Sequence, residues 1–456
     1  MEDDAVKFLG TFVSESFYYW ASVVMLLIHV GFLAYEGGVA RTKNVLATMV
    51  KNLLTLSSVG LTFFLFGFWI YNGFPLWPFG PLLGPWTNPD TLSETAQAAF
   101  AVTVTSYPWA ENMGPNVGDH LTTVFWFAFA LFAMTTGSIM SGAVIERIKI
   151  GGYLILSIIL GSFCWVIAAA RGWNYWGWFT TKLGYHDFGC SAIVHGVSGF
   201  FVLGVLIVLG PRIGKYVNGK PVPILPHNLP LTMVGLMAIF VGFYGFLAAC
   251  AIMLPGAAGI TTIYGTPMTL ASIGSSTTLA LTAGIIGAYV SSKGDPFFTI
   301  SGGLAGIITI GAGIDLYSSP LIIVLAFCGA FLMPKMAMFI ERIGIDDVVG
   351  AFAVHGFCGL IGAILPGIFA AGYVQQEGIP PISFLGQLIP ALICTIALGF
   401  IPGFVSAFVL NKFGLLRVSK EEELGGLDIV DCGYNAYPEQ GISVVDAKDA
   451  DPIPSR

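Results

Sequence analysis

The chain has 456 residues, of which 55% are hydrophobic and only 10% are charged. Soluble globular proteins carry about 25% charged residues, so this composition excludes an ordinary soluble enzyme and predicts a polytopic membrane protein. The net charge of -7 says little about partners, because membrane topology places the charges. The first residues, MEDDAVKFLG, are acidic, unlike the basic start of a secretory signal peptide.

Eleven apolar runs reach the length of about 20 residues that crosses a bilayer. In chain order they cover residues 14–36, 44–72, 120–145, 151–170, 190–210, 230–253, 262–291, 298–314, 318–339, 350–373 and 386–411. The segment 73–119 is rich in Pro, Gly and Trp, so it predicts a folded loop with a short helix near residues 92–106. The expected fold class is an all-α integral membrane protein with eleven transmembrane helices.

The basic residues predict the orientation of these helices. When the eleven runs are threaded through a bilayer, all Lys and Arg residues except Lys7, Arg171 and Lys182 lie on one side. Because basic residues concentrate in cytoplasmic loops, the N-terminus is expected outside and the C-terminus inside a cell (inner) membrane. Residues 1–412 form the expected transmembrane domain, and the polar, acidic residues 413–456 form a cytoplasmic tail.

One phrase occurs twice, as DFGCSAIVHGVSGF at residues 187–200 and as DVVGAFAVHGFCGL at residues 347–360. Each copy has an Asp, a His eight residues later, a Gly next, and another Gly three positions on. Five spans separate the copies, and an odd number gives the two halves opposite orientations. This inverted-repeat architecture occurs in many transporters, with the substrate path at the repeat interface. We expect two five-helix repeats at about 14–212 and 228–373, followed by a C-terminal helix at 386–411.

His195 and His355 lie near the start of the two repeated helices and are expected to face each other. Ionisable groups inside a membrane are costly and usually line a pathway, although a single buried His is often only a packing group. An imidazole exchanges a proton near neutral pH, and two in contact share one proton more easily than both carry a charge. The pair therefore suits a narrow path for a small hydrogen-bonding molecule, or a proton relay.

Asp187 and Asp347 precede these histidines by two helical turns. A carboxylate in this place caps the free N–H groups of a helix start, which is the interpretation favoured for Asp347. For Asp187, attraction of an arriving cation is an equally open alternative. The two glycines after each His are one turn apart, a spacing that lets helix backbones approach closely in lipid.

Neither a metal centre nor a redox site is indicated. The seven cysteines include no CxxC pair, and apolar packing is their expected role. The six histidines show no HxxH or HxxxH spacing. The sequence therefore predicts a protein that has no cofactor, is not an enzyme and has no nucleic-acid partner.

Five stretches resemble the ammonium transporter family (Amt, Mep and Rhesus proteins) and follow that family's order. They are GGVARTKNVL (37–46), SGAVIERIKIGGYLI (141–155), DFGCSAIVH (187–195), PHNLPLTMVG (226–235) and DDVVGAFAVHGFCGLIGAILPGIFA (346–370). The resemblance covers nearly the whole chain. It implies eleven helices around one pore per subunit, a homotrimer in the lipid bilayer, and ammonium or ammonia as the substrate.

The resemblance also implies roles for residues in the pore. His195 and His355 match the family's twin histidines. Phe132 and Phe246 match the phenylalanines that gate the pore from outside.

At the external ammonium site, the resemblance makes Trp176 the aromatic wall, with Trp173 as the alternative. Asp187 matches the aspartate needed for ammonium recruitment. The chain departs from the family at Cys250, where a hydroxyl residue is usual, and at Leu247, where a polar Asn is usual. A thiol is a weaker acceptor than a hydroxyl, so weaker ammonium binding is expected.

The tail stretch GGLDIVDCGYNAY (425–437) resembles the family's regulatory motif, with Cys432 and Tyr434 in place of the usual His and Glu. In the family, trimeric nitrogen-regulatory proteins of the PII class dock nearby. The expected function is ammonium transport, in which ammonia, with a proton, passes the two histidines. Two alternatives stay open: an ammonium sensor with little transport, and a Rhesus-like channel for another small neutral molecule.

Overall fold

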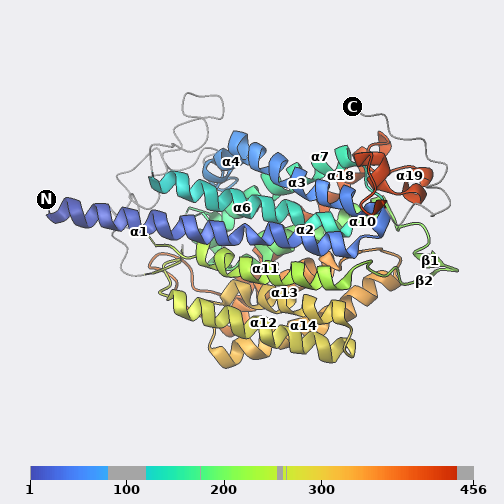
Figure 1. The fold of residues 1–456 in the computed structure, drawn as a ribbon. Coiled ribbons are helices and arrows are strands. Elements are labelled where there is room, and N and C mark those ends of the chain that lie inside the picture. The colour runs from blue at the N-terminus through green and yellow to red at the C-terminus, as the bar shows by residue number, and fades with distance from the viewer. Residues whose placement is uncertain (1, 81–119, 175, 254–259, 263, 439–456) are drawn as a thin grey trace.

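The computed structural model describes residues 2–80, 120–174, 176–253, 260–262 and 264–438. These residues form one bundle of helices whose axes run roughly alongside one another (Figure 1). The helix α1 (Glu2–Met25) starts at one end of the bundle, and the helix α19 (Lys420–Gly425) lies at the other. The short helix expected near residues 92–106 falls outside the described residues.

Eleven of the described helical segments are long and apolar enough to span a membrane, which confirms the number predicted from the sequence. They are Phe8–Val39, Thr42–Gly73, Val124–Ala143, Ile150–Gly172, Ser191–Leu209, Leu229–Ala249, Leu270–Ser292, Pro296–Gly313, Ser319–Arg342, Phe352–Phe369 and Phe384–Lys412. Each overlaps one of the predicted apolar runs. Because the number is odd, the chain enters the bundle on one side of the membrane and leaves it on the other.

Several spans of the first half join an α-helix to a tighter or wider helical turn. The remaining elements are α2 (Leu27–Val39), the 3₁₀ turn η1 (Thr42–Asn44), α3 (Val45–Thr62), the π-helix η2 (Phe63–Gly67), α4 (Phe68–Gly73), α6 (His120–Ala143), α7 (Ile150–Ile159), the π-helix η5 (Leu160–Cys164), α8 (Trp165–Gly172), α9 (Trp178–Leu183), the π-helix η6 (Ser191–Gly196) and α10 (Val197–Leu209).

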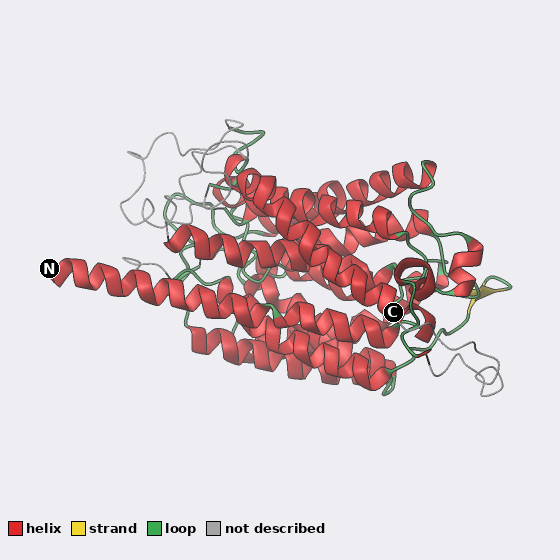
Figure 2. Ribbon diagram, turned by 45° about the horizontal axis from the view of Figure 1, so that its top comes forward, coloured by secondary structure: helices red, strands yellow, loops and turns green. Residues whose placement is uncertain are grey.

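The second half repeats this construction after a short hairpin, in which Tyr216 pairs with Pro221 and Val217 with Lys220. The elements are β1 (Tyr216–Val217), β2 (Lys220–Pro221), α11 (Leu229–Ala249), α12 (Leu270–Ser292), α13 (Pro296–Ile310), the 3₁₀ turn η7 (Gly311–Gly313), α14 (Ser319–Arg342), the π-helix η8 (Phe352–Phe357), α15 (Cys358–Ile364), α16 (Pro366–Phe369), α17 (Phe384–Leu392), the π-helix η9 (Ile393–Phe400), α18 (Ile401–Lys412) and the π-helix η10 (Asp428–Cys432). Figure 2 shows the hairpin at the same end of the bundle as the tail.

The spans that carry the repeated phrase cross backbone against backbone. A Cβ added to Gly199 would collide with the main chain of Gly356, and a Cβ added to Gly359 would collide with that of Gly196. In the repeat, Gly199 corresponds to Gly359 and Gly356 corresponds to Gly196, so the two contacts are equivalents of each other. Small residues permit such close helix approach in lipid, and this matched pair of contacts fits the predicted inverted repeat.

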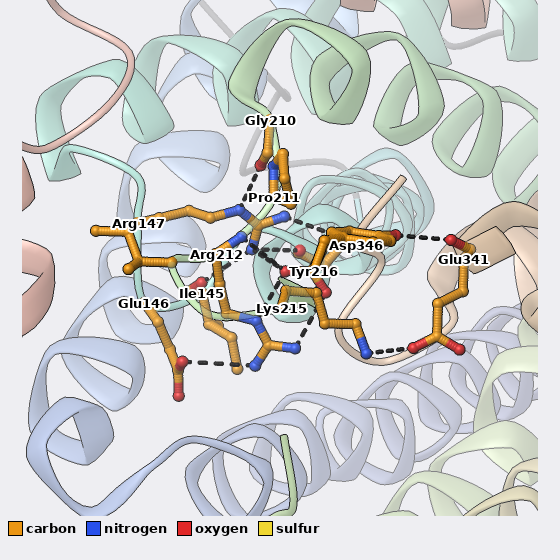
Figure 3. A network of polar contacts seen from close by, with 12 residues as sticks. Ile145, Glu146, Arg147, Gly210, Pro211, Arg212, Lys215, Tyr216, Glu341 and Asp346 are labelled. Atoms are coloured by element: carbon orange, nitrogen blue, oxygen red, sulfur yellow. Dashed lines mark hydrogen bonds and ion pairs between the residues drawn. The ribbon is translucent and has the colours of Figure 1, made fainter. Parts of the chain in front are cut away.

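A buried ionic network connects the loops at the end of the bundle that carries residues 413–438, here named the tail face (Figure 3). Arg212 donates to the Asp346 carboxylate through Nε at 2.8 Å and through Nη2 at 3.1 Å. Arg147 Nη2 donates to the Asp346 carbonyl at 2.6 Å. Glu146 accepts from Arg41 Nε at 2.7 Å and from Arg212 Nη1 at 3.4 Å. Loops that are distant in the sequence are thereby held together where the spans end.

The described part of the tail packs on this network within its own chain. The buried carboxylate of Glu423 accepts from the Ile213 backbone N–H at 2.6 Å and from Arg417 at 2.7 Å. Further along, the Asp428 carboxylate accepts from the Ala47 N–H at 2.9 Å. These bonds join the tail to the ends of the second and fifth spans.

Candidate transport pore

His195 and His355 meet in the interior of the bundle. Their Nδ1 atoms are 3.0 Å apart, and their rings lie 5.2 Å apart between centroids with 22° between their planes. Both side chains are buried, and each belongs to a π-helical first turn, η6 or η8. An N–H···N bond needs one donor and one acceptor, so one Nδ1 holds a proton and the other does not.

The two helix starts are capped in the same way by Asp187 and Asp347. Asp187 accepts hydrogen bonds at 2.6–3.0 Å from the backbone N–H groups of residues 191–193. Asp347 accepts at 2.7–2.9 Å from the N–H groups of residues 351–352. Burial raises the pKa of Asp187, although these backbone hydrogen bonds oppose that shift. The geometry supports the capping interpretation for both carboxylates, and Asp187 is fully buried.

A column of aromatic rings leads to the histidines from the end of the bundle opposite the tail face. Trp173 packs edge-on against Phe132 at 4.9 Å, and Phe132 packs edge-on against Phe246 at 4.5 Å. The ring of Phe246 lies 5.9 Å from that of His195. Phe132 and Phe246 are almost completely buried, with 1% and 0% exposure. The column therefore places both predicted gate residues directly above the histidine pair.

Of the two tryptophans considered for the outer wall, the structure shows Trp173 in this column. Its indole N–H donates to the Asp187 carbonyl at 2.9 Å, which fixes the ring over Phe132. The backbone N–H of Trp176, which is half-buried, donates to Asn174 Oδ1 at 3.0 Å. Trp173, the alternative that the sequence left open, thus contacts the predicted gate residue Phe132.

Cys250 lies one turn after Phe246, at the end of α11. Its thiol donates to the Phe246 carbonyl at 3.2 Å and is buried. Leu247, also buried, adds only apolar surface here. The outer end of the column therefore offers aromatic faces and a thiol where the sequence comparison with the family leads one to expect polar side chains.

Sequence reasoning missed His186, which is buried beside Asp187. Its Nδ1 lies 2.9 Å from Gln375 Oε1, and its Nε2 lies 2.9 Å from Asp315 Oδ1. Burial lowers the pKa of His186, but its hydrogen bonds and its attraction to Asp315 outweigh burial and raise it above the ordinary value. This imidazole holds three loops together around the start of η6. The sequence did contain a signal for His186, because it is an ionisable residue directly before the capping residue Asp187.

A cavity of about 250 Å³ lies at the tail face and is lined in part by Asp346, Asp347, Val348 and Gly350. These residues directly precede η8, so the cavity lies at the foot of the helix that carries His355. Among the described residues, no group of His, Cys, Asp and Glu side chains is arranged to hold a metal ion.

The two imidazoles, His195 and His355, determine which molecules can form hydrogen bonds at the centre of the bundle. Among the described residues, Nε2 of His195 has no hydrogen-bond partner although it is buried. A buried polar atom without a partner costs free energy, so a small hydrogen-bonding molecule that passes this point is stabilised there. The surrounding Phe243 and Phe246 rings, each 5.9 Å away, offer no such bond and exclude ordinary hydrated ions.

Comparison with known proteins gives the family. A sequence model described as the Ammonium Transporter Family matches residues 16–437. The chain belongs to the ammonium transporter family. This is a family of membrane transporters and not of enzymes.

Two relatives of this family member come from Methanocaldococcus jannaschii. Its "Ammonium transporter Amt2" is 33% identical over 426 residues, which cover 92% of this chain and 90% of the relative. Its "Ammonium transporter Amt1" is 31% identical over 428 residues, which cover 93% and 97%.

Solved structures show the same fold as this ammonium transporter family member. A "Sensor Amt Protein" superimposes with a TM-score of 0.73 at 24% identity, covering 95% of this chain and all of that one. Mep2 from Candida albicans superimposes with a TM-score of 0.69 at 22% identity, covering 95% and 93%. At these identities the likeness is one of fold.

Proposed function

We propose that the protein transports ammonium by passing its nitrogen through the bundle as ammonia, past His195 and His355. The observation that carries this proposal is the buried imidazole pair, with 3.0 Å between the two Nδ1 atoms, beneath an aromatic column. The identity of the substrate, ammonium, is proposed from the relatives whose names call them ammonium transporters.

The physical argument begins at the outer end. Aromatic faces attract a small cation, by about 0.5–2 kcal/mol each, so Trp173 and Phe132 are suited to recruit ammonium. A bare cation enters an apolar path at high cost. Ammonium avoids most of that cost by releasing its proton, whereas K⁺ has none to release. Neutral ammonia then passes Phe132 and Phe246 and forms hydrogen bonds with the imidazoles, which also have the acid–base chemistry to handle the proton.

Orientation and assembly belong to the same proposal. The tail face carries basic residues such as Arg41, Arg147 and Arg212, which favours the cytoplasm. The N-terminus then lies outside, and the Trp173 end receives ammonium. We further propose that the protein is a homotrimer, and that the tail face receives a nitrogen-regulatory partner of the PII class.

A sensor is the second candidate. The specific observation is the tail, whose Glu423 binds the backbone just after the span that carries His195, and whose Asp428 binds the start of the second span. Such an arrangement allows occupancy of the pore to alter the tail. A sensor binds ammonium with little flux, so flux distinguishes the two candidates.

The experiment is transport in reconstituted liposomes. An ammonium gradient is expected to produce current and nitrogen uptake with the wild type, and neither with His355→Ala at equal amounts of folded protein. Cys328→Ala, at an exposed cysteine, is the matched control and is expected to behave as wild type. Full flux in His355→Ala contradicts the proposal. Ammonium binding without flux in the wild type favours the sensor, and flux of carbon dioxide but not ammonium favours the Rhesus-like channel.

A further inference from the structure

His186 lies just before the span that begins at Ser191, and the proposed function does not use it. Its side chain and that of Asp315 are completely buried, and Nε2 lies 2.9 Å from the carboxylate oxygen Oδ1. On the other side of the ring, Nδ1 lies 2.9 Å from Gln375 Oε1. Three segments that are far apart in the sequence therefore meet at one imidazole.

The protonation state of His186 follows from these two partners. The amide nitrogen of Gln375 donates to the Gly184 carbonyl at 2.9 Å, so the amide oxygen is the atom that faces the ring. An amide oxygen and an ionised carboxylate accept hydrogen bonds but donate none. A neutral imidazole has one donor nitrogen, whereas an imidazolium has two. His186 therefore satisfies both contacts only as an imidazolium.

The second oxygen of Asp315 extends the ion pair to Tyr264. Thr266 Oγ1 donates to Asp315 Oδ2 at 2.9 Å and lies 2.7 Å from the hydroxyl of Thr262. That hydroxyl accepts from the Tyr264 backbone N–H at 3.1 Å. The Tyr264 ring packs on the His186 ring, with 4.4 Å between centroids and 43° between the planes. The ion pair therefore holds Tyr264 both through its backbone and through its ring.

The hydroxyl of Tyr264 connects the ion pair to the proposed ammonium site. It donates to the Gly172 carbonyl at 3.1 Å and accepts from the Asp187 N–H at 3.2 Å. Gly172 directly precedes Trp173, and the Asp187 carbonyl accepts from the Trp173 indole N–H at 2.9 Å. One hydroxyl thus fixes both the backbone before Trp173 and the residue that orients its ring.

We infer that His186, as an imidazolium paired with Asp315, is a positioning residue for the ammonium site. The ion pair holds Tyr264, and Tyr264 holds the Trp173 ring over the predicted gate. The inference rests on the proposed function, because that proposal assigns the Trp173 face to ammonium. His186 itself does not contact the cation; it acts through the placement of an aromatic ring.

This role predicts that ammonium recognition depends on the external pH. Asp315 and Asp187 are the carboxylates that act on His186, the Tyr264 phenol packs on it, and the other facing side chains, Gln375 and Gln387, are neutral. The two carboxylates and the hydrogen bonds outweigh burial and raise the pKa of His186 above its ordinary value of about 6.5. The contribution of the ion pair is therefore present below about pH 6.5 and is lost as pH rises through the raised pKa.

The test is ammonium-induced current in liposomes, with the internal pH fixed and the external pH varied from about 6 to about 9. The half-saturation concentration is expressed as ammonium ion at each pH. In the wild type it should be constant at the acidic end and should rise at higher pH. His186→Gln should raise it about two- to thirtyfold at acidic pH, the range of one aromatic contact to a cation. The maximal current should stay within about twofold of wild type, because the ammonia path is intact.

Two further variants test the route from His186 to Trp173. Asp315→Asn keeps an oxygen acceptor but removes the charge, which lowers the pKa of His186, so the rise should begin at a lower external pH than in wild type. Tyr264→Phe removes only the hydroxyl and should match His186→Gln. The double variant of these two should be no weaker than either single variant, because both act through one route. Glu377→Gln, at an exposed carboxylate close to Gln375 in the chain, is the control and should follow the wild type at every pH.

A higher half-saturation concentration with the maximal current retained, together with the displaced pH profile of Asp315→Asn, supports the inference. Unchanged half-saturation in His186→Gln and Tyr264→Phe overturns it while the proposed function stands. Loss of maximal current alone, at equal amounts of folded protein, also overturns it. If His186→Gln does not fold, an unshifted pH profile in Asp315→Asn is enough to overturn the inference. If the wild type gives no ammonium current, the proposed function fails and this inference fails with it.

Discussion

Asp346 and Asp347 are neighbours in the chain, but their carboxylates lie in opposite electrostatic surroundings. Burial raises the pKa of Asp346, yet Arg147 and Arg212 outweigh burial and hold it well below its usual range. Burial raises the pKa of Asp347 to about 6, although its bonds to the backbone of η8 oppose the shift. One residue therefore holds the tail-face network together, while the next caps the helix of His355.

The raised pKa of Asp347 predicts a pH dependence of stability. Between about pH 4 and pH 6 the folded protein binds more protons at this carboxylate than the unfolded chain does, so stability falls as pH rises through that window. The slope approaches about 1.4 kcal/mol per pH unit at most. Asp347→Asn should lack this contribution, so thermal midpoints in detergent should fall less from pH 4 to pH 6 than in wild type.

Asp346→Asn is the matched comparison for that measurement. The stability supplied by Asp346 is present above the unfolded pKa of about 4 and is lost only at lower pH. Removing this charge takes away the carboxylate that faces two buried arginines, and breaking a buried ion pair in this way costs about 3–5 kcal/mol. The variant should be less stable by a constant amount between pH 5 and pH 7. Parallel pH profiles for wild type and Asp347→Asn would contradict the assigned shift.

Because the repeated helices cross closely, we expect that Gly199 cannot be replaced by a larger residue without loss of stability. Gly199→Ala places a Cβ against the main chain of Gly356, and overpacking of this kind costs about 1–3 kcal/mol. We expect a lower thermal midpoint together with weaker transport, because the helices that carry the imidazoles must separate. Gly274→Ala, in α12 with no atom near the added Cβ, should be neutral or stabilised by up to about 1 kcal/mol. Equal behaviour of the two variants would show that the crossing tolerates a methyl group.

The hydrogen bonds of Glu423 predict that a substitution there releases the tail from the tail face. Glu423→Gln weakens bonds to Arg417 and to the Ile213 N–H, and a hydrogen bond to a charged group is worth about 1.5–3 kcal/mol. The population of released tail should rise by about one to two decades, and trypsin should cut faster at the exposed Lys420. Glu421→Gln, at an exposed carboxylate, should be cut at the wild-type rate.

Deletion of the tail from Glu421 onward extends the same test. It should change the transport rate but leave the assembly intact, which size-exclusion chromatography and liposome flux measure separately. Unaltered rate and affinity would mean that the tail is a passive extension.

Cys250 predicts a gain of affinity. Cys250→Ser keeps a donor for the Phe246 carbonyl and presents a stronger acceptor to a cation. One such hydrogen bond, at about 1.5–3 kcal/mol, corresponds to about one to two decades in affinity. The half-saturation concentration of ammonium-induced current should fall, and Cys328→Ser should not alter it. An unchanged or higher value in Cys250→Ser would mean that this side chain does not face the cation.

The spans and the histidine pair were readable in the sequence for simple reasons. A span needs about 20 apolar residues, and a repeated Asp-His-Gly phrase separated by five spans can meet itself only across an inverted repeat. The order of Phe132 and Phe246 above His195 came from the family resemblance alone, since Phe is too common in this chain to single out two of 36.

Other features depended on contacts that no pattern encodes. Trp173 follows the last residue of α8, where helical periodicity stops, so its packing on Phe132 could not be predicted from a sequence pattern. The predicted apolar run of the first span ends at Glu36, whereas the helix continues to Val39.

The backbone contact between Gly199 and Gly356 has a consequence for how such a protein can change over generations. The spacing of the two helices that carry the imidazoles is set by main chain against main chain, so a substitution changes it only where it adds a Cβ at the crossing, as at Gly199 or Gly359. Substitutions at residues such as Cys250 and Leu247 can then change which molecule the entrance recognises, while the helix crossing at the histidines stays the same. Exchange of entrance residues can therefore change rapid uptake into detection, or one small-molecule substrate into another, in proteins that keep the same spacing of the two helices.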